Sequence, residues 1–217
     1  MAKRNFFKLK KNKTLLAKLL LIEVFMFVFL VGFLPEPWHK MAYTSLYAAL
    51  FYTCALNLAK YEKMLWIATV PFVLQWSAAY FDFHILNAAS KILSIFFFIF
   101  VVIVLINQIS KARNVNEIVI LEAIIGYLLL GIVFSLLISL MVQFDPYAYN
   151  FSASGELKLY DVVYYGFVTL STLGYGDLLP LSPHSKSLAL ITTIGGQLYI
   201  AVIIALLVGK YSSRRND

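Results

Sequence analysis

One short stretch decides how the rest of this chain is interpreted: residues 172–177 read Thr-Leu-Gly-Tyr-Gly-Asp. Carbonyl groups point alternately to opposite sides along an ordinary extended chain, and turning successive ones to one axis requires some residues with φ above zero. Glycine adopts such backbone angles at low cost, and Gly174 and Gly176 have the spacing to do so. The stretch therefore predicts a row of backbone oxygens that face a common axis.

The other residues of this stretch fit the same geometry. Tyr175 would point its ring away from the axis, Thr172 can add its hydroxyl oxygen at the inner end, and Asp177 would place a carboxylate at the outer mouth, where it concentrates cations. Rings of backbone carbonyls from four copies of a closely similar peptide replace the water shell of potassium. We therefore predict that residues 172–176 bind the ion, with K+ held at Thr172, Leu173, Gly174 and Tyr175.

Composition places the chain in a membrane. Of its 217 residues, 61% are hydrophobic and 13% are charged, and a soluble domain of this length could not bury that much apolar surface. The net charge of +7 could suggest a nucleic-acid partner. However, the basic residues lie at the chain end and in short connections, where membrane topology predicts them, so nucleic acid is excluded as a partner.

Six apolar runs are long enough to cross a bilayer as helices: about 15–34, 41–59, 64–80, 86–106, 119–142 and 188–208. The first run is too long for a signal peptide and lacks a small-residue cleavage site, so we expect it to be retained and to stop at the turn formed by Pro35 and Pro37. Pro71 predicts a kink in the third run.

The segment 160–171 is apolar but too short to span a membrane. We interpret it as a helix that descends into the membrane and ends at the filter. The negative end of its dipole would face the cavity below and favour a cation there. Irregular backbone at membrane depth is tolerated when it lines a water path, and a filter meets that condition.

The distribution of basic residues predicts the topology. With the N-terminus inside, most of the 18 Lys and Arg residues fall in inner segments, and the outer segments hold only Lys40, Lys91, Lys158 and Lys186. The expected location is the cell membrane, crossed several times, with both termini cytoplasmic and Asp177 outside. The basic N-terminus also favours contact with anionic membrane lipid.

The predicted fold class is an all-α membrane protein with six transmembrane helices, a re-entrant pore helix and a selectivity filter. One filter per chain requires four chains, so a homotetramer around a central pore is expected. The expected divisions are a cytoplasmic N-terminus (1–14), a four-helix membrane domain (15–110), a pore domain (111–209) and a cytoplasmic tail (210–217), which leaves no room for a soluble regulatory domain after the sixth helix. The expected parts of the pore domain are an outer helix (117–143), a pore helix (160–171), the filter (172–177) and an inner helix (186–209).

Residues 164–177 resemble the pore segment of the potassium channel family, with paired aromatics, a Thr/Ser-rich stretch and the T-V-G-Y-G-D pattern, in which Leu173 replaces the commoner valine. The likeness extends over about 117–209. It implies that Tyr164 and Tyr165 support the filter, with a hydrogen bond from Tyr165 to Asp177. Val168 stands where some bacterial members carry a glutamate, so that carboxylate is missing here. The lean tail and loops favour a prokaryotic six-helix member.

Gating is less well specified. A voltage sensor needs several basic residues on the fourth helix, but the fourth run holds no arginine and only Lys91 near its outer end, so weak or absent voltage dependence is expected. Gly195 and Gly196 lie mid-span in the sixth run, where family members often carry a glycine that lets the helix bend. Close packing of these small residues against another helix explains them equally well. Ala201 and Ala205 are candidates for lining the inner pore.

Three other features remain open at this stage. Glu23 is an acid well inside an apolar run, either a functional group or a partner of Lys18 or of another helix. Asn150 begins an Asn-Phe-Ser glycosylation pattern, which has meaning only in a secretory pathway. Cys54 is alone and expected to be a buried apolar residue.

Alternative functions stay within transport. A poorly selective cation channel, a non-conducting accessory subunit and a potassium-uptake transporter built from fused pore repeats remain to be distinguished. No nucleophile and base pair, metal cluster or phosphate loop predicts an enzyme, and no cofactor is expected besides K+ as the permeant ion.

Overall fold

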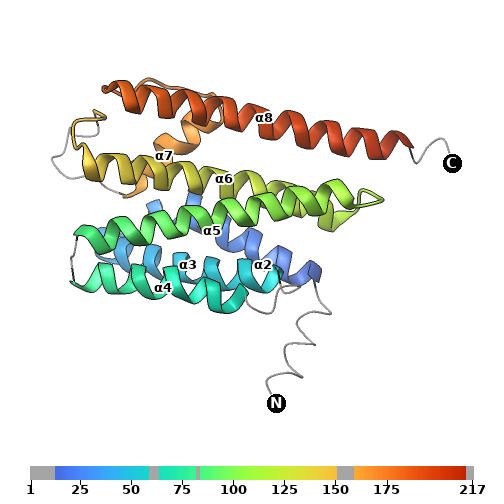
Figure 1. The fold of residues 1–217 in the computed structure, drawn as a ribbon, viewed down its shortest axis with the longest axis horizontal. Coiled ribbons are helices and arrows are strands. Elements are labelled where there is room, and N and C mark those ends of the chain that lie inside the picture. Colours follow the sequence, from blue (N-terminus) through green and yellow to red (C-terminus); the bar gives the residue numbers. More distant parts are fainter. Residues whose placement is uncertain (1–12, 59–63, 82–83, 151–158, 214–217) are drawn as a thin grey trace, which may run out of the picture.

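Helices make up the regular structure of the described residues, apart from an isolated bridge between Tyr149 and Pro180. The computed structural model describes residues 13–58, 64–81, 84–150 and 159–213, and Figure 1 shows most of its helices running side by side along one long axis. They are α2 (Lys13–Phe25), the π-helix η1 (Met26–Leu30), the 3₁₀-helix η2 (Val31–Phe33), α3 (Glu36–Asn57), α4 (Met64–Phe81), α5 (His84–Lys111), α6 (Glu117–Phe144), α7 (Leu159–Leu170) and α8 (Pro183–Ser213). The predicted all-α class is confirmed for the described residues.

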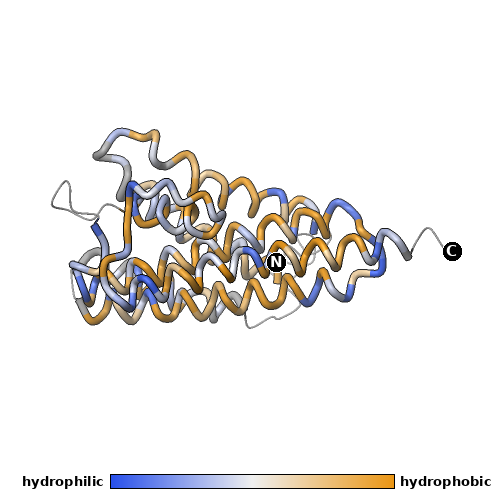
Figure 2. The backbone as a smooth tube through the Cα atoms, turned by 90° about the horizontal axis from the view of Figure 1, so that it is seen from above, coloured by the Kyte–Doolittle hydropathy of each residue, from blue (hydrophilic) through white to orange (hydrophobic). Residues whose placement is uncertain are grey.

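Three of the described helices are long and apolar enough to cross a bilayer: Ile85–Lys111, Glu117–Phe144 and Pro183–Ser212. Leu159–Leu170 is a shorter apolar helix, as the sequence predicted for the segment before the filter. Figure 2 shows hydrophobic residues over most of each helix and hydrophilic ones mainly near the helix ends and turns. The first three predicted runs are helical too, and their crossing of the membrane stays a prediction.

Several predicted boundaries need correction. The first run, expected to be one helix, changes from α to π at Met26 and then tightens to a 3₁₀ turn over Val31–Phe33, a local change of helix type that apolar content does not predict. The inner helix begins at Pro183, earlier than the expected residue 186, because Ser182 caps it and accepts the Ser185 N–H at 3.1 Å. It also continues to Ser213, so part of the expected tail is helical. Pro71 does lie inside α4.

Parts of other sequence-based expectations lie outside the described residues. These are the basic residues of 1–12, the turn 60–63, Ser152 of the glycosylation pattern, Lys158 and the last four residues.

Helix α6 lies at the centre of the packing. It contacts α2 and α5 on one side and α7 and α8 on the other, so it joins the first four helical segments to the last two. The larger hydrophobic cluster includes Phe51 and Phe98 of the first four segments together with Leu129 of α6. A second cluster surrounds α7 and includes Phe134 and Tyr165. The site described below is therefore held from behind by α6.

Polar contacts join neighbouring helices at the end of the bundle where α5 ends and α6 begins. Lys13 of α2 pairs with Glu122 of α6 at 2.7 Å, and the Glu122 side chain is only 6% exposed. On the opposite flank, the Lys210 ammonium of α8 donates to the backbone carbonyls of Ile109, Ser110 and Ala112. A cation at the C-terminal end of α5 matches the partial negative charge there. Sequence reasoning singled out neither Glu122 nor Lys210.

The Glu122 ion pair gives a prediction about stability. We expect Glu122→Gln to lower the free energy of unfolding by about 1–2 kcal/mol, less than a fully buried pair loses, because Lys13 is 46% exposed. Glu117→Gln is the matched control, since Glu117 pairs with Lys18 at 2.6 Å but both side chains are about half exposed. Thermal unfolding in detergent would compare the two variants, and equal losses would contradict the assignment.

Glu23, the acid within the first apolar run, has a structural partner. Thr53 of α3 donates to its carboxylate at 2.6 Å, so Glu23 joins α2 to α3. Lys18, the other partner considered, pairs with Glu117 instead. Cys54 is fully buried and free, as expected.

Candidate functional site

The pore helix candidate α7 is wedged between α6 and α8 by glycine contacts. A Cβ atom added at Gly166 would lie 2.5 Å from Ser135 Oγ of α6, and one added at Gly131 of α6 would lie 2.3 Å from the Phe167 ring. On the other side, a Cβ at Gly196 of α8 would lie 2.3 Å from the Leu170 carbonyl oxygen. Because glycine has no Cβ, it allows the neighbouring helix to come this close at each position. The three helices are therefore packed closely next to residues 172–177.

The backbone after α7 has the alternating conformation that the sequence predicted. Gly174 has a φ of 55° and Gly176 a φ of 78°, which confirms positive φ at both glycines. Thr172 also has a positive φ, of 62°, which sequence reasoning did not foresee, because a β-branched residue rarely adopts it. Such an outlier persists only where its surroundings hold it, and outliers of this kind cluster at functional sites.

Hydrogen bonds to α7 fix the direction of the carbonyl groups. The Thr172 N–H donates to Thr169 O at 3.1 Å, and the Leu173 N–H donates to Val168 O at 3.0 Å. In a trans peptide the N–H and the preceding carbonyl point in opposite directions, and no described peptide bond is cis. The carbonyls of Ser171 and Thr172 therefore point away from α7, toward the open side of the stretch.

That open side is uncovered in the single chain. Leu173 is 56% exposed and Tyr175 is 67% exposed, and residues 171–177 are all exposed. Helix α8 also presents an uncovered apolar face that includes Ile194, Leu198 and Val202. Ala201 and Ala205, the predicted inner-pore residues, are exposed on the same helix. Apolar surface of this extent is characteristic of a face that another protein surface or lipid covers.

Asp177 is held by Tyr164, and not by Tyr165 as the resemblance implied. The Tyr164 hydroxyl donates to Asp177 Oδ2 at 2.7 Å, and this bond is the main cause of a pKa of Asp177 below its usual range. Tyr165 is buried and meets the ring of Tyr149 edge-on at 5.2 Å. Consecutive helix residues point about 100° apart, so only one of the two tyrosines can face the aspartate.

The segment after residues 172–177 is anchored to the segment after α6. The Leu181 N–H donates to Ala148 O at 2.7 Å, and Asn150 N donates to Leu179 O at 3.1 Å. The Asn150 side chain also accepts from the Leu179 N–H. Asn150 thus has a structural role that its glycosylation pattern did not suggest.

Gly195 and Gly196 lie within the uninterrupted helix α8. Gly196 is the closer packed of the two, against Leu170, whereas a Cβ at Gly195 would lie 3.0 Å from the tip of the Phe134 ring. Packing therefore accounts for Gly196, and a hinge at either residue stays a prediction. Lys91 of α5 donates to Gln143 of α6 at 2.9 Å, which ties the first part of α5 to the end of α6.

The Tyr164 bond gives a prediction about acid sensitivity. The pKa of Asp177 is lowered, so its charge and its bond are present at neutral pH and are lost as the pH falls through that lowered pKa. Tyr164→Phe removes the main lowering cause, so the pKa of Asp177 should rise. In a channel with Asp177 at its mouth, we therefore expect the acid-induced loss of ion current to begin at higher pH. Tyr165→Phe makes the same chemical change without touching Asp177 and serves as control. Identical titrations of the two variants would contradict the role of Tyr164.

Comparison with known proteins agrees with this geometry. Residues 138–212 match the model of a protein family described as an ion channel. No curated protein and no solved structure matches the chain. The matched residues contain the end of α6, α7, the stretch 172–177 and nearly all of α8. The comparison therefore supports an ion channel family for the region that holds the candidate site.

Proposed function

We propose that this protein is the subunit of a potassium-selective channel in which four identical chains surround one pore. The observation that carries the proposal is the positive φ at Thr172, Gly174 and Gly176, every second residue of the stretch. This alternation favours carbonyls that face one side. Four such rows around an axis would supply the oxygen cage that replaces the water shell of K+.

The homotetramer is proposed from what a single chain leaves incomplete. One row of carbonyls cannot surround an ion, and the exposed side chain of Tyr175 needs a neighbour. In the tetramer, Ala201 and Ala205 would line the inner pore and Asp177 would attract cations to the outer mouth. The Tyr164 bond to Asp177 would keep that carboxylate in place.

The other four helical segments are proposed to form a membrane domain beside the pore, with both termini in the cytoplasm. Strong voltage gating through α5 is not expected, because its described residues hold no arginine and Lys91 is bound to Gln143. Steep gating charge in a patch-clamp record would refute this part of the proposal.

The decisive experiment is recording from purified protein in planar bilayers with a K+ gradient opposed to a Na+ gradient. Potassium selectivity predicts a reversal potential close to the K+ equilibrium value, whereas a poorly selective cation channel predicts a value near zero. Absence of current would favour the accessory-subunit alternative. Native mass spectrometry would show four chains for the channel, whereas a transporter built from fused repeats needs fewer.

A further inference from the structure

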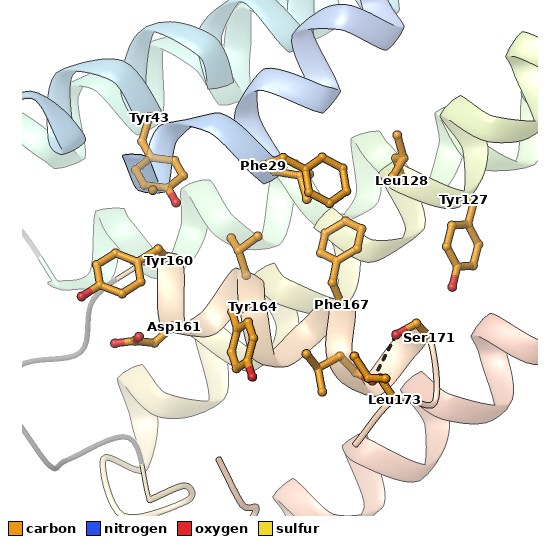
Figure 3. Close-up of a pocket in the computed structure, with 14 residues that line it drawn as sticks. Phe29, Tyr43, Tyr127, Leu128, Tyr160, Asp161, Tyr164, Phe167, Ser171 and Leu173 are labelled. Carbon is orange, nitrogen blue, oxygen red and sulfur yellow. Dashed lines mark hydrogen bonds between the residues drawn. The ribbon is translucent and has the colours of Figure 1, made fainter. Parts of the chain in front are cut away.

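A cavity of about 630 Å³ lies between α7 and the first helical segment (Figure 3). One wall is a face of α7 that carries Tyr164 and Phe167, and the opposite wall holds Phe29 of η1 and Gly32 of η2. Leu128 of α6 also lines it. The volume falls in the range of about 300–1,000 Å³ that is typical of ligand sites.

The two ends of the cavity differ in chemistry. Figure 3 shows Tyr43, Tyr160 and Asp161 gathered toward one end, whereas Phe167 and Leu173 lie toward the other. A carboxylate with tyrosine rings beside it attracts a cationic group, through its charge and through the faces of the rings. The other end is largely apolar, with the hydroxyls of Tyr127 and Ser171 near Leu173. Such a cavity matches an amphiphile that has a hydrocarbon tail and a cationic head.

The surroundings of the cavity indicate where such an amphiphile comes from. Phe29 of the cavity wall is itself 45% exposed, and Leu30 and Phe33 beside it are 44% and 86% exposed. Large exposed apolar side chains next to the cavity continue its lining onto the outer surface of the helices. In a membrane, lipid tails cover such a surface.

We propose that this cavity binds one acyl chain of a membrane phospholipid whose head group carries a primary amine. The amine lies at Asp161 and the chain extends toward Leu173. An anionic head group without an amine is disfavoured, because its negative charge would be repelled by the negative charge of the Asp161 carboxylate. The proposal rests on the proposed function for the depth of α7 in the membrane. It goes beyond that function because it assigns a lipid that touches the filter from behind, through the Leu173 side chain.

The test is photolabelling of the full-length protein in phosphatidylcholine vesicles. The probe is a lipid with a diazirine in its acyl chain, carrying either an ethanolamine or a glycerol head group. Mass spectrometry of the digest locates the label. We expect it on peptides of η1–η2 and α7, about fivefold more from the ethanolamine lipid than from the glycerol lipid.

Substitutions that remove a charge or fill the cavity distinguish binding at this site from general contact between lipid and the helices. Asp161→Asn should bring the fivefold preference close to one. Asp145→Asn makes the same charge change outside the cavity, retains an acceptor for the Tyr147 N–H, and should leave the preference unchanged. Gly32→Leu and Val163→Phe add volume from opposite walls, and each should reduce labelling of α7 severalfold.

Three results would overturn the proposal: label spread evenly over all helices, equal labelling by the two head groups, or labelling unaffected by both added-volume variants. A benzophenone attached at Val28→Cys in a Cys54→Ser background tests the other occupant. A cross-linked dimer would show that a second copy of the chain fills the cavity. None of these measurements requires ion conduction, so failure of this site and failure of the channel function are distinguishable.

Discussion

Gly174→Ala is expected to abolish potassium current while the helices remain folded. Gly174 has a φ of 55°, and a side chain in this left-handed region costs about 1–2 kcal/mol per residue. A Cβ there would meet no atom within 4 Å in the chain, so the penalty comes from the backbone and not from a clash. The peptide can relieve it by rotating, which turns a carbonyl away from the axis. In the proposed tetramer the loss would be repeated four times around the pore.

The measurement is potassium flux into vesicles, with circular dichroism to check helix content. Gly209→Ala is the matched control: Gly209 is in α8, a Cβ there also meets no atom within 4 Å, and its φ is not positive. The control should conduct like the original chain. Normal, selective current from Gly174→Ala would mean that the stretch 172–177 does not bind the ion through its backbone.

The positive φ of Gly174 and Gly176 could be predicted from the sequence, because glycine is the residue type that adopts such angles at low cost. Residue type did not predict positive φ at Thr172, which depends on the hydrogen bonds that return to α7. The choice between Tyr164 and Tyr165 depends on the rotation of α7 about its axis. That rotation is set by packing on α6, through contacts such as Gly166 with Ser135.

Long-range partners were the least predictable part of the site and its support. The contacts of Lys13 with Glu122 and of Lys210 with the end of α5 join residues about a hundred positions apart. Their chemistry is ordinary, but periodicity gives no information on which helices lie side by side. Helix ends could be predicted in part. Ser182 and Pro183 together mark the start of α8, but a prediction from hydropathy alone does not use this capping signal.

Gly196→Ala is expected to disrupt the pore, and Gly195→Ala to have a much smaller effect on stability. A Cβ at Gly196 would lie 2.3 Å from the carbonyl oxygen of Leu170, the last residue of α7, so backbone must move. Overpacking of this kind costs about 1–3 kcal/mol, and the movement displaces the residues that follow α7. A Cβ at Gly195 would lie 3.0 Å from the tip of the Phe134 ring, which can turn aside.

The pair of variants also separates packing from bending. If α8 bends at these glycines, both alanine variants should change the open probability to a similar degree while the tetramer stays equally heat-resistant. If Gly196 serves packing, its variant alone should lose heat resistance in detergent and lose selectivity, since the proposed filter begins two residues after Leu170. Heat resistance of the tetramer and reversal potentials, measured on the same preparations, decide between the two. The contact between Gly196 and Leu170 favours the packing result.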